Sequence, residues 1–228
     1  MALCLTLLFS VSAFAAGTLR ADEPVLVYRA ERITDPNQLM MRAQLGIDER
    51  SEAVKQVTNV AAETVFSEGE AEVYTTTQLI RRERKADGTI IEEYASVAVA
   101  RSTGTGSSSN QETENSVMVY AMINYKYEIS SNLNMSFGIS NTQHRAVYPS
   151  SVTVNSLYLK NEIDNVYEPV ATNSRTISSV TMGTWYTLSA PTSQLYPKAS
   201  ANLYAFTTAN LPDGKEAFVR CVIYCNSL

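Results

Sequence analysis

The chain contains one histidine, His144, and this residue limits the nucleophilic chemistry that the protein can carry out. A Ser-His-Asp or Cys-His arrangement needs an imidazole beside its nucleophile, so any such site must use His144. No Gly-x-Ser-x-Gly elbow is present, and no lysine has a serine three residues before it. His144 lies next to a predicted loop, and we expect it to be exposed. The sequence therefore assigns no catalytic residue.

Metal and cofactor sites lack their usual sequence signals. A zinc site built from histidine and carboxylate ligands would need a second histidine. Neither the Asp-x-Asp-x-Asp-Gly calcium loop nor the phosphate-binding Gly-x-x-x-x-Gly-Lys-Ser/Thr loop occurs. We expect no metal site and no cofactor.

Three cysteines are present, of which Cys4 lies in the N-terminal apolar run and Cys221 and Cys225 lie near the C-terminus. On an extended strand Cys221 and Cys225 share a face but lie roughly 13 Å apart. A disulfide needs Cα atoms within about 7 Å, so a Cys221–Cys225 bridge requires a bend in the chain after Ile223. Two buried thiols on the inner face of the last strand are the interpretation we favour.

One pair of acids is placed for glycoside hydrolysis, which needs two carboxyl groups at a suitable separation. Glu162 and Asp164 would share a face of an extended segment, roughly 6.5 Å apart. Such pairs arise by chance in an acidic chain, and nothing in the sequence indicates a cleft. A secreted carboxylate-dependent glycosidase is therefore kept as an alternative function.

Trp185 and Tyr186 are the candidate ligand-binding residues, because aromatic rings have flat apolar faces that can stack on sugars. A core anchor is the more ordinary role for Trp185. The basic cluster Arg81-Arg82-Glu83-Arg84-Lys85 suits anionic wall polymers or lipid headgroups. A charged hairpin end, which discourages edge-to-edge strand pairing, is the interpretation we favour for this cluster.

The first residues predict export. Ala2 to Phe14 is an apolar run without charge, and Ala13 and Ala15 are the small residues that a signal peptidase reads. We predict cleavage after Ala15 and a secreted protein. The form of the signal sequence also suggests a bacterial source. No Lys or Arg precedes the apolar run, which leaves a misassigned start, an uncleaved anchor or a buried helix as alternatives. The run is shorter than the roughly 20 residues of a membrane span, and no later stretch is long enough to span.

The composition favours a mainly β protein of one domain. The 228 residues are 45% hydrophobic and 18% charged, and the chain includes 13 Tyr among many Ser, Thr and Val. These residue types suit half-buried pleated surfaces. The net charge of −5 argues against a nucleic-acid partner, since phosphate binding needs a basic face.

Periodicity and turn signals divide the chain into segments. Residues 1–15 form the signal peptide, 16–69 a partly helical segment, 70–101 a β-hairpin, 102–116 a Ser/Gly-rich loop, and 117–228 an antiparallel β-sandwich. An immunoglobulin-like arrangement is one option for the sandwich.

Two helices are expected in the N-terminal segment. Asp35-Pro36 is typical of a helix start, and Gly46 can end that helix. A second helical pattern runs from residue 49 to about residue 65, although its Thr and Val content weakens the pattern.

The hairpin prediction rests on Asp87-Gly88, which is typical of a two-residue turn between strands. That turn would place Arg82 opposite Glu93, a favourable cross-strand pair.

These observations favour a non-enzymatic extracellular β-sandwich that acts as a binding or surface module, with a cell-wall polymer, a carbohydrate or a protein as partner. The secreted glycosidase is one alternative. A membrane-active β toxin is another, because amphipathic Ser/Thr-rich strands can form a barrel in lipid.

Overall fold

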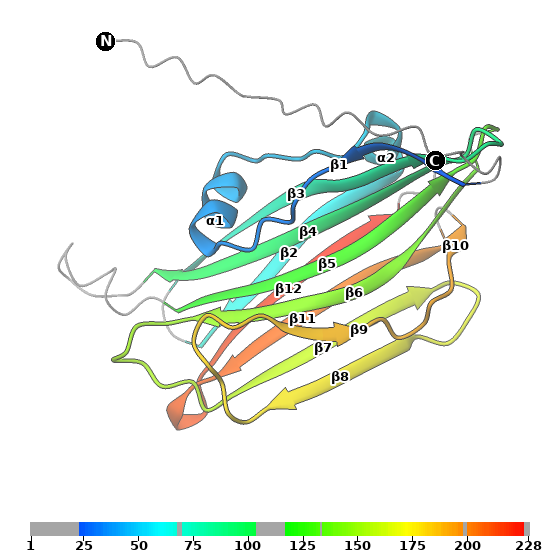
Figure 1. The fold of residues 1–228 in the computed structure, drawn as a ribbon. Helices are drawn as coiled ribbons and strands as arrows, with labels where there is room; N and C mark the ends of the chain where they lie inside the picture. Colours follow the sequence, from blue (N-terminus) through cyan, green and yellow to red (C-terminus); the bar gives the residue numbers. More distant parts are fainter. Residues whose placement is uncertain (1–22, 68–69, 104–116, 133, 198–199, 226–228) are drawn as a thin grey trace, which may run out of the picture.

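The computed structural model describes residues 23–67, 70–103, 117–132, 134–197 and 200–225 (Figure 1). The predicted signal peptide and most of the predicted 102–116 loop lie outside these residues. The elements, in chain order, are β1 (Val25–Arg29), α1 (Pro36–Gln44), α2 (Glu52–Val57), β2 (Thr58–Phe66), β3 (Glu70–Arg84), β4 (Ile90–Thr103), β5 (Met118–Ile129), β6 (Met135–Val147), β7 (Ser156–Asn165), β8 (Ala171–Ile177), β9 (Tyr186–Ser189), β10 (Tyr196–Pro197), β11 (Ala201–Asn210), a 3-10 turn (Pro212–Gly214) and β12 (Glu216–Cys225).

The strands form two antiparallel sheets that pack face to face, which confirms the prediction of a mainly β sandwich (Figure 1). Sheet A is seven-stranded in the order β1-β3-β4-β5-β6-β10, with β9 also paired to β6. Sheet B is five-stranded in the order β2-β12-β11-β7-β8. In sheet A the strands β3 to β6 follow one another as a meander. The immunoglobulin-like option stays a prediction.

Strands from distant parts of the sequence share both sheets. The predicted hairpin, β3 and β4, continues sheet A beside β5, so the residues before and after the 102–116 loop lie in the same sheet. Strand β2 pairs along its nine residues with β12, at the other end of the chain. The N-terminal segment thus supplies the edge strand of sheet B.

The first predicted helix is confirmed and the second is not. Asp35 caps α1, and its side chain accepts a hydrogen bond from the backbone N–H of Gln38. Gly46 follows the helix with a φ of 64°, a conformation that glycine adopts without strain. The helix expected from 49 to about 65 ends at Val57, and its second half is β2. Pairing with β12 overrides the weak helical pattern there, since the β-branched residues of this stretch suit a strand.

The hairpin exists, but its turn and register differ from the prediction. The loop consists of Ala86, Asp87 and Gly88, closed by the bond from the N–H of Lys85 to the carbonyl of Thr89 at 2.8 Å. Gly88 has a φ of 85°, as the bulge residue of such a loop requires. The longer loop moves the register by one residue.

As a consequence of that register, Arg82 lies opposite Glu92, and the predicted pairing with Glu93 is wrong. Arg81 takes the place opposite Glu93.

Two hydrophobic cores cover the two faces of sheet A. The main core lies between the sheets and includes Ile123, Tyr125 and Leu203. A second core lies on the outer face of sheet A, which α1 covers (Figure 1). There Leu39 of α1 packs with Val97 and Tyr120. The chain therefore covers the outer face of sheet A with its own N-terminal segment.

Within the described ranges, no helix has the length and apolar character needed to cross a membrane.

Candidate functional site

His144 lies in the interior of the sandwich, so the expectation of an exposed loop histidine is wrong. It belongs to β6, and its ring lies between Thr142 Oγ1 and Thr207 Oγ1, each 2.8 Å away. The predicted loop is in fact the middle of a strand that β5 and β9 flank on both sides. The pairing of β6 with β5 and β9 places this polar stretch in the interior, and the local sequence cannot indicate that pairing.

The hydrogen bonds around His144 define its tautomer. The hydroxyl of Thr207 donates to the carbonyl of Tyr120 at 2.8 Å, so Thr207 Oγ1 accepts the bond from His144 Nδ1–H. Asn161 Nδ2 donates to Thr142 Oγ1 at 3.1 Å, which leaves the Thr142 hydroxyl to donate to His144 Nε2. Burial lowers the pKa of His144 to about 3, against a smaller opposing effect of a backbone hydrogen bond at Phe206. The imidazole is therefore neutral and has a structural role. Because it is buried, it is not accessible to a substrate, as Ser-His-Asp catalysis would require.

Cys221 and Cys225 both lie on β12, which runs without a break to Cys225, and they are not joined in a disulfide. The bend after Ile223 that a bridge needs is absent from this strand. Cys221 is buried, and burial raises the pKa of its thiol to about 12 although a backbone hydrogen bond at Ala98 acts in the opposite direction. Its thiol donates weakly to the carbonyl of Ser96 at 3.7 Å. Cys221 is therefore an inert core residue.

Trp185 and Tyr186 lie on opposite faces of sheet A and form no common platform. Trp185 packs in the second core against Tyr120, with ring centroids 5.9 Å apart. Its Nε1–H donates to the carbonyl of Thr34 at 3.0 Å, and Arg145 lies over its ring. Tyr186 packs against the main core. Both residues anchor the fold in this structure.

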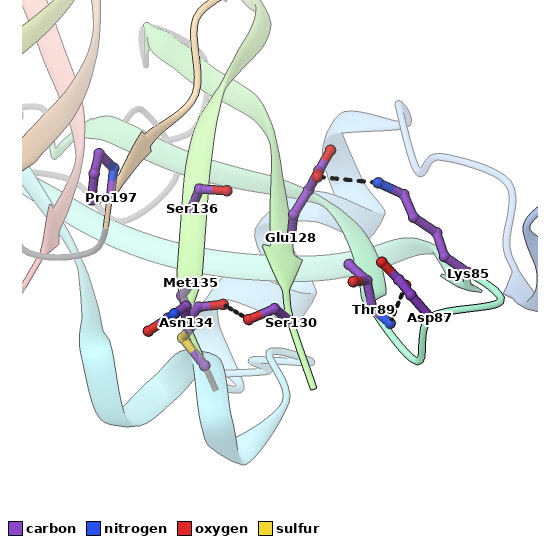
Figure 2. Close-up of a pocket in the computed structure, with 9 residues that line it drawn as sticks. All are labelled: Lys85, Asp87, Thr89, Glu128, Ser130, Asn134, Met135, Ser136 and Pro197. Carbon is purple, nitrogen blue, oxygen red and sulfur yellow. Dashed lines mark hydrogen bonds and ion pairs between the residues drawn. The ribbon is translucent and has the colours of Figure 1, made fainter. Parts of the chain in front are cut away.

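A pocket lined mostly by polar residues, here called the polar pocket, lies at one end of sheet A and has a volume of about 600 Å³ (Figure 2). Its lining residues are Lys85, Asp87, Thr89, Glu128, Ser130, Asn134, Met135, Ser136 and Pro197. They come from the β3–β4 turn, from β5, β6 and the turn between them, and from β10. Figure 2 shows Lys85 and Glu128 joined across the pocket, with Nζ and Oε2 3.3 Å apart.

The pocket's carboxylates are held in their ionised form. Partial burial acts to raise the pKa of Glu128, but hydrogen bonds from Lys126 and Lys85 outweigh it and hold the pKa below its usual value. Hydrogen bonds from Thr89 lower the pKa of Asp87. A glycosidase needs one carboxyl group whose raised pKa keeps it protonated. These two groups suit the acceptance of hydrogen bonds, and neither suits proton donation.

Glu162 and Asp164 do share a face of β7, as predicted, but that face is the outer face of sheet B. Glu162 forms an ion pair with Lys160. Neither acid lines the polar pocket.

The basic cluster at 81–85 is largely neutralised by neighbouring acids. Arg82 Nε donates to Glu92 Oε1 at 2.7 Å, and Arg81 pairs with Glu83. Glu92 is buried and also accepts bonds from Ser51 Oγ and from the hydroxyl of Tyr94. The cluster thus stabilises the hairpin and the contact with α2.

The outer face of sheet B carries a group of aromatic side chains that the sequence reasoning missed, here called the aromatic face. Its aromatic members are Tyr158, Tyr204, Phe206, Phe218 and Tyr224, from β7, β11 and β12. None of them belongs to either core. Phe206 contacts Tyr204 with ring centroids 5.9 Å apart and Phe218 at 6.3 Å, and Tyr204 contacts Tyr224 at 6.5 Å. These contacts give a continuous row of rings across β11 and β12.

Cations lie between these rings. Lys160 Nζ is 5.0 Å from the centroid of Phe206, and Arg220 lies 5.6 Å from the centroids of both Tyr204 and Phe206. Both cations also have acidic partners, since Arg220 pairs with Glu63 and Lys160 with Glu162. The charges of the aromatic face are therefore locally balanced.

Strand alternation alone was an incomplete signal for this surface. In β11 the residues Leu203, Ala205 and Ala209 point inward, whereas Tyr204 and Phe206 point outward. A period of two shows which residues share a face, but here the smaller residues occupy the core and the large rings face outward. The sequence could have identified the group but not its side of the sheet.

Among the described residues, no group of three His, Cys, Asp or Glu side chains is placed to hold a metal ion.

No protein-family model, curated protein or solved structure matches this chain.

Proposed function

We propose that this protein is an exported, non-enzymatic bacterial module that binds a protein partner through the aromatic face of sheet B. The observation that carries the proposal is the difference between the two outer faces. The chain covers the outer face of sheet A with α1 and Trp185, whereas the rings of the aromatic face lie outside both cores. Partly exposed aromatic side chains that gather on one sheet face are typical of an interaction surface.

Binding is favoured over catalysis by the state of the titratable groups. His144 is buried and neutral, and the carboxylates of the polar pocket are ionised. Cys221 is buried as a thiol. These groups offer neither a general acid nor an activated nucleophile near neutral pH.

A protein is favoured over a sugar or a polyanion by the arrangement of the cations. Lys160 and Arg220 lie against Phe206, in the position that a stacked sugar ring would need. Their pairing with Glu162 and Glu63 removes the excess positive charge that a polyanion would require. Aromatic residues and arginine are enriched in the cores of protein interfaces.

Export is part of the proposal because of the apolar N-terminal run and the small residues at Ala13 and Ala15. An exported module without catalytic groups would act through contact with other molecules outside the cell.

Tyrosine footprinting in the producing culture would test the proposed surface. Tyr158 of the aromatic face and Tyr28 of β1 are matched reporters, because 37% and 41% of their surfaces are exposed. We expect iodination of Tyr158 to be suppressed in the culture relative to dilute purified protein, and iodination of Tyr28 to be equal in both. Equal labelling of Tyr158 in the two samples would show that the aromatic face has no partner in the culture. Protection that survives protease treatment of the other components and disappears with polysaccharide hydrolases would replace the protein partner with a sugar.

A further inference from the structure

We propose that the partner of the aromatic face is a second copy of this chain, packed face to face about a two-fold axis that runs parallel to the strands. This inference rests on the proposed function and identifies its partner. It is argued from the register of sheet B and from the distribution of charge along each cross-strand row.

The register of sheet B defines rows of side chains on its outer face. The central row is Glu63, Arg220, Phe206 and Lys160, in the order β2, β12, β11 and β7. The rows on either side are Val65, Phe218, Thr208 and Tyr158, and Ala61, Val222, Tyr204 and Glu162. Each row therefore begins on the edge strand β2 and crosses four strands.

The central row is complementary in charge to the same row of a second copy that runs in the opposite direction across the strands. An axis between β11 and β12 places β2 over the partner's β7, and β12 over the partner's β11. Glu63 then faces Lys160 of the partner subunit, and Arg220 faces Phe206 of the partner subunit, each contact occurring twice. The first contact is an ion pair.

The row beside it is also complementary, because Val65 then faces Tyr158 of the partner subunit. Val65 is 64% exposed, so an apolar cover would remove a large hydrophobic side chain from water.

An axis perpendicular to the strands would give the opposite result. With that axis through the central row, Glu63, Arg220 and Lys160 would each face the same residue of the partner subunit. Like charges placed directly opposite each other repel. Charge complementarity thus favours the parallel axis over this perpendicular one.

Sheet twist does not remove this match. Stacked sheets cross at about 30°, and β2 lies about 7 Å from the axis at a strand spacing of about 4.8 Å. The rotation therefore displaces Glu63 by about 4 Å from Lys160 of the partner subunit, which the long lysine side chain can span.

The available area fits a weak dimer. Nine residues at about 3.3 Å and four strands at about 4.8 Å cover about 570 Å² of flat sheet per copy. Specific interfaces bury about 600 to 1,000 Å² per partner. The flat area of this face lies near the lower end of that range, and the side chains that project from it add further surface. We therefore expect a concentration-dependent equilibrium between monomer and dimer.

Sedimentation of the purified mature chain, from about 1 µM to about 1 mM, tests the inference. The wild type should shift from monomer to dimer over this range. Lys160→Glu and Glu63→Lys should each weaken the dimer about tenfold or more, and the double variant should recover it, because the facing pair is restored with reversed signs. Lys126→Glu is the matched control, since Lys126 is a similarly exposed lysine on β5 of sheet A that also pairs with a glutamate. It should leave the equilibrium unchanged.

A second pair of variants avoids the intramolecular ion pairs of Lys160 and Glu63. Val65→Asp should abolish the dimer, whereas Val166→Asp should not, because Val166 is 73% exposed and lies in the β7–β8 connection. Circular dichroism would verify that each variant is folded.

A wild type that stays monomeric at the highest concentration overturns the inference, as does a double variant that fails to recover the dimer. A monomeric wild type combined with a protected Tyr158 in the culture would leave the proposed function intact and assign the face to a different protein. A monomeric wild type with an unprotected Tyr158 would reject both.

Discussion

His144 illustrates how the role of a single residue depends on its neighbours in space. The segment around it is polar and resembles a loop when read along the chain. In the fold, hydroxyls from Thr142 of β6 and Thr207 of β11 satisfy both ring nitrogens. A buried imidazole with both nitrogens bonded needs no charge, and charging it would cost the hydrogen bond that Nε2 accepts.

The buried imidazole predicts a pH dependence of stability. Folded His144 stays neutral down to about pH 3, whereas the unfolded side chain titrates near 6.5, so the unfolded state binds more protons between these values. Its contribution is complete above pH 6.5 and is lost as the pH falls towards 3, at up to about 1.4 kcal/mol per pH unit. Urea unfolding of the wild type and of His144→Gln, at several pH values from 7 to 4, should show a shallower loss for the variant.

NMR provides an independent check on the same residue. Because the chain has one histidine, its ring resonance can be assigned directly in an untagged protein. The resonance should not titrate between pH 8 and pH 4. A midpoint near 6.5 would show that the ring is solvated.

At the scale of elements, the turn between β3 and β4 decides which charges meet. Three groups hold this turn: the Lys85 and Thr89 backbone pair, the Asp87 side chain that accepts from the N–H of Thr89, and Gly88. With this loop Arg82 meets Glu92, which also binds Ser51 at the start of α2. A two-residue turn would have shifted these partners by one residue and turned the buried acid to the other face.

Substitution of Gly88 should measure the cost of that turn. Gly88→Ala places a Cβ at a φ of 85°, with ordinary van der Waals contact to Ser131, so backbone strain is the expected penalty. We expect a loss of about 1 kcal/mol in the free energy of unfolding, from urea titration at pH 7. Gly88→Asn is the control and should lose less, since Asn tolerates this conformation better. Equal stability of Ala and Gly at this position would contradict the assigned turn.

At the scale of the whole molecule, the two outer faces of the sandwich differ. The segment before α1, α1 itself and Trp185 cover the outer face of sheet A. The corresponding face of sheet B carries rings and paired charges with no core contact. This asymmetry makes sheet B the surface at which assembly is expected.

The proposed export also concerns the whole molecule, and it can be tested by mass. Fractionation of the producing culture, followed by intact mass measurement, should give an extracellular species that begins at Ala16. Removal of the apolar run would follow from recognition of Ala13 and Ala15. A cell-bound species that retains Met1 would instead indicate an uncleaved anchor.

The sequence by itself determined the local features that depend on near neighbours. These include the mainly β class and the helix capped by Asp35, because capping and strand periodicity act over a few residues. It also indicated the β3–β4 hairpin. The Asp-Gly motif is compatible with loops of two or three residues, so it could not define the register of the hairpin.

Only the tertiary structure decided what depends on contacts between distant segments. The conversion of residues 58–66 to strand required β12, more than a hundred residues later, and the burial of His144 required Thr207 of the opposite sheet. The outward placement of Tyr204 and Phe206 followed from which face of sheet B met sheet A. Period-two patterns are symmetric with respect to the two faces of a strand, so only packing between the sheets could assign the inside and the outside.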